Sequence, residues 1–454
     1  MGLSTTQALC SCLPPLLDTM PVPHLYNSDV NCEPPQVRPG EVRDLHRILI
    51  AGHFGFPNGE GATARVHAYA KGLSGAGCDV RVVCLGWTER STQGAKNQEV
   101  HGSYQGIPFV YAGGSPFRDT SFARRRLRTA RAALQLARMA RPAHGRGPAD
   151  VILLSYDGPI TSALWPVTTV MACRFAGSAF VMEKSEYPFV YAPAWTKAWA
   201  WVVTRTMYKL PDAVIVISTC LERYFLSRVR RGARVIRIPI LVDLDEFHLS
   251  PAEAPDRDIL SYAGNLDNPG EVEDLLESFG EVAARFPQWS LRIIGGSRDP
   301  RALDRFRARA ADMGLVERVE FTGSVGRLEI PGLLREAAAF ALPRASGIFS
   351  TAGFPTKLGE YLAMGKPVVV TATGDIPLYL RDGVDAYLVP PDDTHAFAAR
   401  LAEVFADPSA AREVGERGRE TARREFDIVS QCRRLADFME EVGSAKAPSQ
   451  VIPG

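Results

Sequence analysis

Residues 353–367 carry the start and stop signals of a short helix whose amino end is open to a ligand. Pro355 suits the first turn of a helix, because the N–H that proline lacks would have no partner there. Gly365 suits the position after the last turn, and Pro367 prevents the helix from resuming. The sequence therefore predicts a helix of about ten residues over 355–364.

Three polar side chains of this expected helix could hold the two ends of a nucleotide. The free N–H groups and the dipole at a helix amino end attract an anion, and Lys357 adds a full charge there beside the hydroxyl of Thr356. Glu360 lies one turn further along the same face. Its carboxylate could accept two hydrogen bonds from ribose hydroxyls. The alternative for Glu360 is an ordinary solvated carboxylate.

The surrounding chain alternates short apolar runs with segments of helical period, which is typical of parallel sheets covered by helices. A first series of strands is expected at 47–52, 79–85, 150–155, 179–183, 212–218 and 234–240, and a second at 259–264, 290–295, 319–323, 339–343, 367–371 and 386–389. Helices are expected at 62–73, 272–285, 300–313 and 355–364. This pattern predicts an α/β protein with two doubly wound, Rossmann-like domains that face each other across a ligand-binding cleft.

Changes in composition suggest where these domains begin and end. Residues 1–44 are rich in Pro, Cys and Ser without a period, which predicts a disordered leader. The first domain is expected over 45–242 and the second over 243–425, with 243–258 as an acidic linker. Residues 426–445 are expected to form a helix that packs back toward the first domain. A flexible tail is expected over 446–454.

Bulk properties exclude several classes of protein. The 454 residues exceed what a single hydrophobic core accommodates. A net charge of +1 provides no overall field toward nucleic acid. No run reaches the roughly 20 apolar residues that span a bilayer, and the first residues lack the pattern of a signal peptide, so a cytoplasmic enzyme is expected. The eight cysteines match neither a zinc site nor a disulfide scaffold, and no aspartate cluster suits magnesium.

A second candidate ligand site follows the first expected strand. Gly59 and Gly61 allow the backbone to approach a ligand closely, and the next helix points its amino end at the cleft. Arg65, one turn into that helix, is expected to face either phosphate or solvent. The alternative for this loop is a tight turn without a ligand.

Two carboxylates close the strand expected at 179–183. Glu183 and Glu186 could hold a sugar or an acceptor hydroxyl, and the alternative is that they form ordinary salt bridges. Tyr156 and Asp157, which follow another strand, are weaker candidates for the same wall of the cleft. His53 is a further candidate, although a single histidine is more often structural.

Two segments are compatible with a lipid surface. Residues 122–146 contain eight arginines. The apolar stripe of this expected helix consists of Leu127, Ala130, Leu134 and Ala137. A basic amphipathic helix can lie on anionic lipid. The second segment gathers aromatic residues beside lysine and arginine, with Trp195, Trp199, Trp201 and Tyr208. The alternatives are a solvated helix face and aromatic core packing.

The segment 352–367 resembles the donor-binding helix of family 4 glycosyltransferases. That helix carries two glutamates separated by seven residues in a Glu-Gly-Phe-Gly context. Ala352 stands at the first glutamate position and Glu360 at the second. Further segments that are similar to this family lie at 238–247, 262–266, 291–296 and 319–323, and the likeness extends over residues 46–440.

The resemblance implies a GT-B fold and a retaining glycosyltransferase that moves a sugar from a nucleotide diphosphate sugar to an acceptor hydroxyl. It implies a role in polysaccharide, lipopolysaccharide or glycolipid synthesis, with no metal and no other cofactor. The expected partners are the donor and a saccharide or lipid-linked saccharide. Peripheral contact with the inner face of the cell membrane is also expected, and contact with nucleic acid is not.

The resemblance also implies roles for individual residues. Lys357 is expected to stabilise the leaving diphosphate. Glu183 or Glu186 is expected to replace the histidine that relatives commonly carry at the end of the equivalent strand. The implied donor-binding residues are Gly353, Phe354, Pro355, Thr356, Leu358, Glu360, Gly264, Asn265, Gly295 and Gly296.

Two departures from the family pattern leave alternatives open. Ala352 lacks the carboxylate that usually touches the transferred sugar. Asn265 stands where an arginine often contacts the diphosphate, and Lys357 is expected to supply the missing charge. The alternatives are a nucleotide-sugar 2-epimerase of the same fold and a non-catalytic protein that binds nucleotide sugars.

Overall fold

The computed structural model describes residues 46–59, 61–142, 149–155, 164–187, 202, 205–248 and 258–445. The chain divides into Met1–Asp44 and Leu45–Gly454, and the elements below belong to the second unit. Several expectations lie outside the described residues. They are the leader, the tail, most of the linker, Tyr156, Asp157 and the three tryptophans at 195–201.

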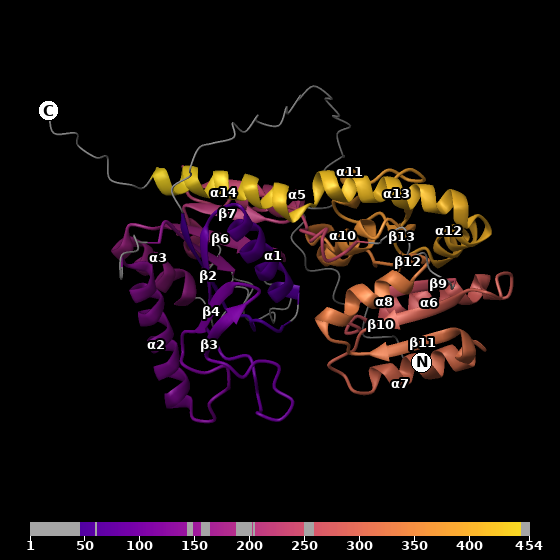
Figure 1. Ribbon diagram of the computed structural model, residues 1–454, viewed down its shortest axis with the longest axis horizontal. Coiled ribbons are helices and arrows are strands. Elements are labelled where there is room, and N and C mark those ends of the chain that lie inside the picture. Colours follow the sequence, from indigo (N-terminus) through magenta and orange to yellow (C-terminus); the bar gives the residue numbers. More distant parts are fainter. Residues whose placement is uncertain are drawn as a thin grey trace, which may run out of the picture. The chain divides into compact units, whose positions relative to one another are not determined.

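The first sheet contains eight strands in the order β3-β4-β2-β1-β5-β6-β7-β8 (Figure 1). Their bounds are β1 (Arg47–Gly52), β2 (Asp79–Cys84), β3 (His101–Tyr104), β4 (Ile107–Tyr111), β5 (Val151–Ser155), β6 (Ala179–Lys184), β7 (Ala213–Val216) and β8 (Arg234–Arg237). Neighbouring strands are parallel except β3 and β4, which form a hairpin at the edge. The expected strands are confirmed. The hairpin was not expected, because β3 is a partly exposed edge strand with no apolar run.

The second sheet contains six parallel strands in the order β11-β10-β9-β12-β13-β14. Their bounds are β9 (Ile259–Ala263), β10 (Ser290–Ile294), β11 (Val319–Gly323), β12 (Ala339–Leu342), β13 (Val368–Thr371) and β14 (Tyr387–Val389). The order runs outward in one direction from β9 and in the other from β12. A sheet wound in this way leaves a crevice beyond the carboxyl ends of the two central strands, where ligands bind.

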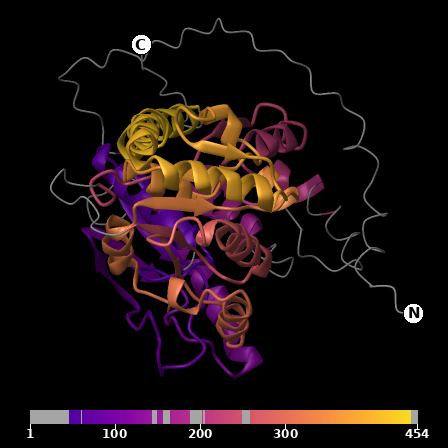
Figure 2. The same ribbon diagram turned by 90° about the vertical axis from the view of Figure 1, so that its right-hand side faces the viewer.

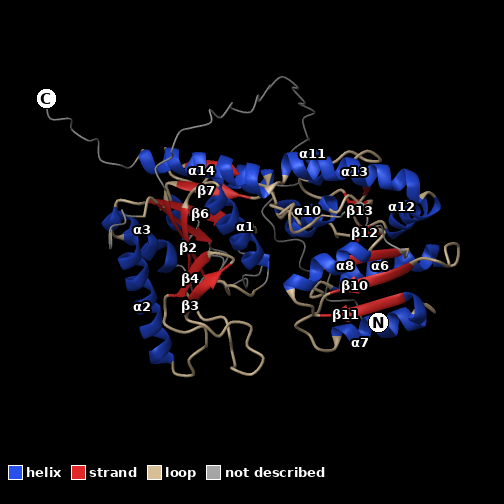
Figure 3. Ribbon diagram, in the orientation of Figure 1, coloured by secondary structure: helices blue, strands red, loops and turns tan. Residues whose placement is uncertain are grey.

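Helices cover both sheets, as expected for doubly wound α/β domains (Figures 2 and 3). The helices of the first lobe are α1 (Gly61–Gly75), α2 (Phe122–Ala140), α3 (Leu164–Ala176) and α5 (Thr219–Leu226). Those that follow are α6 (Pro269–Ala283), α7 (Ala302–Asp312), α8 (Ile330–Glu336), α9 (Ile348–Ala352), α10 (Thr356–Ala363), α11 (Ile376–Tyr379), α12 (Thr394–Ala406), α13 (Pro408–Glu425) and α14 (Ile428–Ser444). The predicted α/β class and doubly wound topology are therefore confirmed.

Helix α10 is the element predicted at 355–364. Pro355 is its N-cap residue, and no side chain caps the amino end. Gly365 has a φ of 67°, the left-handed conformation that ends a helix and that a residue with a Cβ adopts at a cost. The predicted start and stop signals are confirmed. No side chain caps the N–H groups of Thr356 and Lys357, whereas the Leu358 N–H donates to the Pro355 carbonyl.

The carboxyl-terminal helix α14 packs on α1 of the first lobe (Figure 1). Cys432 and Met439 of α14 share an apolar cluster with Val66 and Tyr69 of α1. Gly72 permits this close approach, because a Cβ there would collide with the side chain of Cys432. The chain therefore crosses back to the first lobe after α13, which ties the two lobes at their shared end.

Candidate functional site

The loops that follow β9 and β10 meet at the crevice of the second sheet. The Gly264 N–H donates to the Ile294 carbonyl at 2.9 Å, and the Gly295 N–H donates to Gly323 at 3.1 Å. Gly295 has a φ of 137°, and a Cβ there would collide with the Gly264 carbonyl. A Cβ on Gly296 would collide with Ser324. These glycines allow three strand ends to lie unusually close together.

Lys357 reaches into this crevice from the amino end of α10. Its Nζ donates to the Tyr262 hydroxyl at 3.1 Å and lies 4.3 Å from the centre of that ring. The Tyr262 hydroxyl in turn donates to Glu271 at 2.9 Å. Gly264 makes room for the lysine, since a Cβ at this position would collide with Nζ. The predicted residues Gly264 and Lys357 are thus brought together.

Burial lowers the proton affinity of the Lys357 amine. Desolvation lowers the pKa of Lys357 to about 8, although the carboxylate of Glu271 acts in the opposite direction. A neighbouring cation, Arg344, also lowers it. An anion placed against this ammonium would relieve both effects, so the crevice favours a negatively charged ligand.

Arg344 is a functional candidate that the sequence reasoning missed. It follows β12, the other central strand, and Thr371 fixes its backbone through hydrogen bonds of 2.8 and 3.0 Å. Among the described residues, nothing accepts a hydrogen bond from its buried Nε. Burial lowers the pKa of Arg344, and Glu271 opposes that shift. An arginine directly after a central strand of a doubly wound sheet was the signal that could have identified it.

A cavity opens on the side of α10 that carries Thr356 and Glu360. It encloses about 640 Å³ including its open mouth. Its wall also includes His67 and Lys71 of α1 and Arg327 of the second lobe. Glu360 therefore faces a shared cavity of the two lobes.

The surroundings of Glu360 shift the pKa of its carboxyl in opposite directions. Burial raises the pKa of the Glu360 carboxyl, Arg327 acts in the opposite direction, and Glu246 raises it further. Arg327 lies 3.5 Å from Glu246, with which it forms an ion pair. A half-buried carboxylate with a raised pKa gains from hydroxyl groups that donate to it, as ribose hydroxyls would.

Arg65 and Glu183 form a buried ion pair, which was not expected for Arg65 and is the salt-bridge alternative for Glu183. The Arg65 Nε donates to Glu183 at 2.8 Å, and its terminal nitrogens donate to the carbonyls of Ile238 and Pro239, each at 2.8 Å. Glu183 is 2% exposed and also accepts from Ser155. Arg65 is only 6% exposed and its guanidinium is engaged by these partners, although the residue lines the cavity beside α10. Glu183 adopts the salt-bridge alternative. The pair fastens α1 and β6 to the segment that leaves β8.

The glycine loop and Glu186 lie at the carboxyl ends of first-sheet strands. A Cβ on Gly59 would collide with Thr63, whose hydroxyl donates to the Gly55 carbonyl at 2.7 Å. Gly61 begins α1 with open space around it. Glu186 is exposed two residues beyond β6. Gly59, Gly61 and Glu186 are all exposed, and Gly59 in addition allows the close approach of Thr63.

Several residues before and within α10 have structural side chains, which corrects their expected contact with a donor. Phe354 packs in an aromatic cluster with Tyr379 and Phe426, at ring distances of 5.5 and 5.6 Å. Leu358 is fully buried, and its N–H donates to Pro355. The Gly353 N–H likewise donates to Phe349 at 2.8 Å. The side chains of Phe354 and Leu358 therefore pack inside the protein, and the backbone N–H of Gly353 is already bonded.

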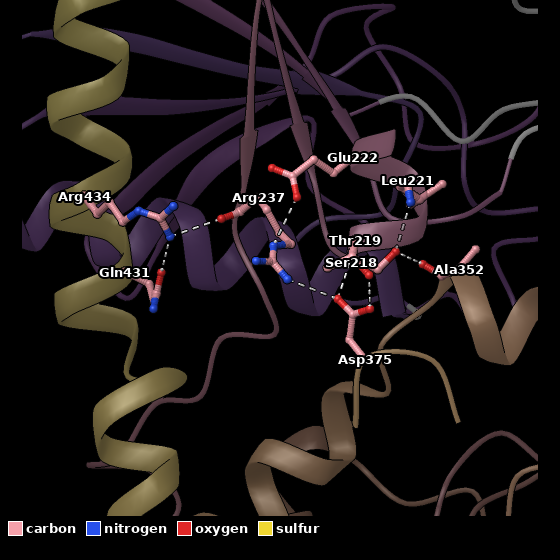
Figure 4. A network of polar contacts seen from close by, with 9 residues as sticks. All are labelled: Ser218, Thr219, Leu221, Glu222, Arg237, Ala352, Asp375, Gln431 and Arg434. Carbon is pink, nitrogen blue, oxygen red and sulfur yellow. Dashed lines mark hydrogen bonds and ion pairs between the residues drawn. The ribbon is translucent and has the colours of Figure 1, made fainter. Parts of the chain in front are cut away.

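Ala352 and Asn265, the two departures from the family pattern, are both engaged. Asn265 closes a turn with Asp267 through bonds of 3.1 and 3.0 Å. Ala352 is fully buried, and its carbonyl accepts a hydrogen bond from the Ser218 hydroxyl of the first lobe (Figure 4). Neither residue therefore supplies a charge to the crevice.

Asp375 connects the two lobes beside Ala352 (Figure 4). Its carboxylate accepts from the N–H of Thr219, at the start of α5, at 2.8 Å. The Thr219 hydroxyl donates to the same carboxylate, and Arg237 lies 3.4 Å away. Asp375 is 2% exposed. A single carboxylate of the second lobe thus binds the amino end of α5 and the guanidinium of Arg237, which both belong to the first lobe.

Comparison with known proteins places this geometry in a family. The profile described as "Glycosyl transferase 4-like domain" matches residues 60–240, and that described as "Glycosyl transferases group 1" matches residues 257–407. The chain belongs to the family 4 glycosyltransferases. The first match begins after β1 and covers the rest of the first sheet, and the second covers the second sheet with helices α6 to α12.

Curated relatives are identical to this chain at between a quarter and a third of the positions in the segments that align. A GDP-mannose-dependent alpha-(1-6)-phosphatidylinositol monomannoside mannosyltransferase of Mycolicibacterium smegmatis is 28% identical over 50% of this chain and 62% of the relative. The putative colanic acid biosynthesis glycosyltransferase WcaL of Salmonella typhimurium is 29% identical over 44% of this chain and 50% of the relative. The matched region thus spans only about half to three-fifths of those relatives' lengths.

Solved structures establish the fold independently of sequence identity. Sucrose-phosphate synthase of Thermosynechococcus elongatus has a TM-score of 0.69 at 20% identity, covering 88% of this chain and all of that one. Anabaena HepE in complex with UDP and glucose has a TM-score of 0.65 at 16% identity, covering 87% of this chain and all of that one. The expected GT-B fold is therefore confirmed.

Two features are absent from the described residues. None of their helices is long and apolar enough to cross a membrane. In the same part of the chain, no three histidine, cysteine or acidic side chains are grouped as metal ligands would be.

Proposed function

We propose that this protein transfers a sugar from a nucleotide diphosphate sugar to an acceptor hydroxyl, with retention of the anomeric configuration. One observation carries the proposal. The uncapped amino end of α10 presents Lys357 to a crevice shared with Arg344, while Glu360, one turn later, lines a cavity. The spacing suits a diphosphate at the tip of the helix and a ribose against its flank.

Lys357, Arg344 and the first N–H groups of α10 would stabilise the leaving group. The bond from the sugar to the diphosphate breaks, and negative charge grows on the phosphate oxygen that leaves. Cations and amides already fixed toward that oxygen stabilise it without reorganising during the reaction. The partly desolvated state of Lys357 strengthens its interaction with the new charge.

The acceptor would attack from the face that the diphosphate vacates. Its oxygen forms the new bond to the sugar, and its proton passes to the departing phosphate oxygen, so charges and atoms balance. No protein nucleophile is needed on this path. The pairing of Glu183 with Arg65 agrees with this assignment, and the exposed Glu186 is left to hold an acceptor or sugar hydroxyl.

Transfer is proposed to need no divalent metal, because the two cations Lys357 and Arg344 supply the charge at the diphosphate. Activity should therefore survive an excess of EDTA. Loss of activity in EDTA, with recovery on adding Mg²⁺ or Mn²⁺, would contradict this part of the proposal.

The acceptor is proposed to be a saccharide or a lipid-linked saccharide in glycolipid or polysaccharide synthesis. One relative acts on a phosphatidylinositol monomannoside, and another is named for colanic acid biosynthesis. A lipid-linked acceptor would place the enzyme at a membrane surface as a peripheral protein. The relatives point to different bases, since one depends on GDP-mannose and HepE binds UDP.

Binding of UDP, GDP, ADP and dTDP by thermal shift is the first test, because a ligand that binds only the folded state raises its melting temperature. The nucleotide that binds then selects the nucleotide sugars for a transfer assay. Glu360→Gln and Arg344→Met should both weaken nucleotide binding. Lys96→Met, at an exposed position of the first lobe, is the control that should bind normally.

Three results would contradict the proposal in different ways. Unchanged affinity in Glu360→Gln and Arg344→Met would exclude this nucleotide site. Binding without transfer or donor hydrolysis would favour the non-catalytic alternative that Ala352 and Asn265 suggest. Conversion of the donor to an epimeric sugar without an acceptor would identify an epimerase.

A further inference from the structure

Helix α2 exposes large apolar side chains to solvent, which is unusual for a helix on a protein surface. Its buried residues are Ala132, Leu136 and Ala140, beside which Ala133 and Met139 are partly buried against the core. Most of the apolar stripe expected from the sequence lies on the outward face instead, where Leu127 is 70% and Leu134 is 52% exposed, whereas Ala137 of that stripe is partly buried against the core. An amphipathic surface helix normally buries its larger apolar residues. Nothing in the described residues covers this stripe.

Arginines run beside these leucines at the same repeat. Arg124, Arg131 and Arg138 follow one another at intervals of seven residues, as Leu127 and Leu134 do, and all three are exposed. Residues seven apart lie two turns apart on nearly the same line of a helix. The outward face of α2 therefore carries a row of leucine next to a row of arginine.

Helix α3 extends this surface. It packs beside α2, and its own outward side presents Met171, 51% exposed, and Phe175, 65% exposed. Arg141, directly after α2, lies 5.9 Å from the centre of the Phe175 ring. We call the outward residues of both helices the α2–α3 face. Its members are Arg124, Leu127, Arg131, Leu134, Arg138, Arg141, Met171, Arg174 and Phe175.

The charge of this face is local and one-sided. Neither α2 nor α3 contains an aspartate or glutamate, whereas the whole chain has a net charge of only +1. Asp119 is the nearest carboxylate in the preceding loop. It forms an ion pair with Arg128 at 2.9 Å and lies 3.8 Å from Arg124. The remaining arginines of the face therefore project a positive field that the rest of the molecule does not share.

We propose that the α2–α3 face docks on the surface of an anionic lipid bilayer. Leucine, methionine and phenylalanine would enter the boundary between headgroups and acyl chains, as the apolar side of an interfacial helix does. The long arginine side chains would extend outward to lipid phosphates. A face without carboxylates fits a uniformly negative surface better than the mixed charges of a typical protein partner. This surface is independent of the nucleotide site, so the inference stands whichever sugar is transferred.

Co-sedimentation of the full chain with vesicles tests the proposal without any nucleotide sugar. The vesicles are pure phosphatidylcholine, or phosphatidylcholine with about 30 mol% phosphatidylglycerol, which gives a negative surface potential. The protein should bind the mixed vesicles and bind the neutral ones weakly. Raising the salt from about 0.1 M to about 1 M should release much of it, because the screening length falls from about 10 Å to about 3 Å.

Two sets of substitutions separate charge from apolar insertion. Arg124→Gln, Arg131→Gln and Arg138→Gln together remove three charges, each contributing roughly a fivefold factor, so the partition coefficient should fall about 100-fold. Leu127→Gln with Leu134→Gln should reduce binding even in high salt. Both sets leave the buried side of α2 intact.

The matched control removes the same number of charges from exposed positions of other helices. Arg309→Gln in α7, Arg412→Gln in α13 and Arg433→Gln in α14 should bind vesicles as the parent does. All variants should keep the parent's nucleotide affinity. Equal binding to both kinds of vesicle, no binding to either, or the same loss in the control triple would overturn the proposal.

Discussion

Replacing Lys357 with methionine removes the ammonium from the crevice while keeping a flexible, mostly apolar chain beside Tyr262. In the proposed complex, Lys357 exchanges its contact with the Tyr262 hydroxyl for one with a diphosphate oxygen. A hydrogen bond to a charged group contributes about 1.5–3 kcal/mol. The affinity for the nucleoside diphosphate at neutral pH should therefore fall roughly 10- to 150-fold.

The same lysine makes affinity depend on pH in a defined direction. Burial lowers the pKa of Lys357 to about 8 in the free protein, and a bound diphosphate favours the charged form and raises this pKa. Below pH 8 the lysine is already protonated, so affinity does not change on its account. Above pH 8 binding requires proton uptake, and affinity should fall by up to about tenfold per pH unit. In Lys357→Met this fall should be absent.

Isothermal titration calorimetry from about pH 7 to about pH 9.5 measures both quantities. Titration in two buffers of different ionisation enthalpy also counts the protons taken up on binding. The control is Lys96→Met, which should keep the parent's affinity and pH profile. The reasoning fails if Lys357→Met binds normally at pH 7, or if it keeps the parent's decline above pH 8.

Three further predictions concern residues that position this site. Gly264→Ala should lower nucleotide affinity nearly as much as Lys357→Met, because the added Cβ displaces the ammonium; calorimetry measures it. Arg65→Met should lower the free energy of unfolding by about 3–5 kcal/mol, because it leaves Glu183 charged and buried without its cation; urea denaturation checks this. Asp375→Ala should cost about 1.5–3 kcal/mol in the same assay, because the amino end of α5 and a cation lose their shared carboxylate.

Each of these predictions is paired with a control or an outcome that distinguishes it from a general loss of folding. Gly332→Ala in α8, where an added Cβ would lie in open space, tests whether any added methyl weakens binding. If Arg65→Met and Glu183→Gln combined are no more stable than the sum of the single changes predicts, the two side chains are not coupled. An Asp375→Ala protein that unfolds like the parent would mean that the contact between the lobes contributes nothing measurable.

The course of the strands and the ends of α10 were predictable because local chemistry dictates them. The runs at 47–52 and 259–264 are mostly apolar, and their strands are buried almost throughout, as is typical of strands covered on both faces. Proline and glycine at 355 and 365 act through backbone geometry alone. The β3–β4 hairpin escaped prediction because an exposed edge strand needs no apolar pattern, and its pairing partner decides its conformation.

The roles of charged residues were predictable only in part. Arg65 and Glu183 are 118 residues apart, and no local pattern shows that each is the other's partner. The same limit hid Arg344, whose importance follows from its place beside Lys357 at the centre of the second sheet. The direction of the α2 stripe was equally beyond the sequence, because periodicity reveals two sides of a helix without stating which one is covered.

By itself the sequence determined the α/β class, the two series of strands, the helix at 356–363 and the pairing of Thr356 with Glu360 on one of its faces. These features depend on interactions between residues a few positions apart, which the chain order contains directly. Tertiary structure alone decided which cations meet at the crevice, which carboxylate is withdrawn into an ion pair and which apolar stripe stays exposed. Those outcomes depend on the burial and charge of segments that come together only when the sheets fold, and desolvation then sets how strongly each charged group interacts.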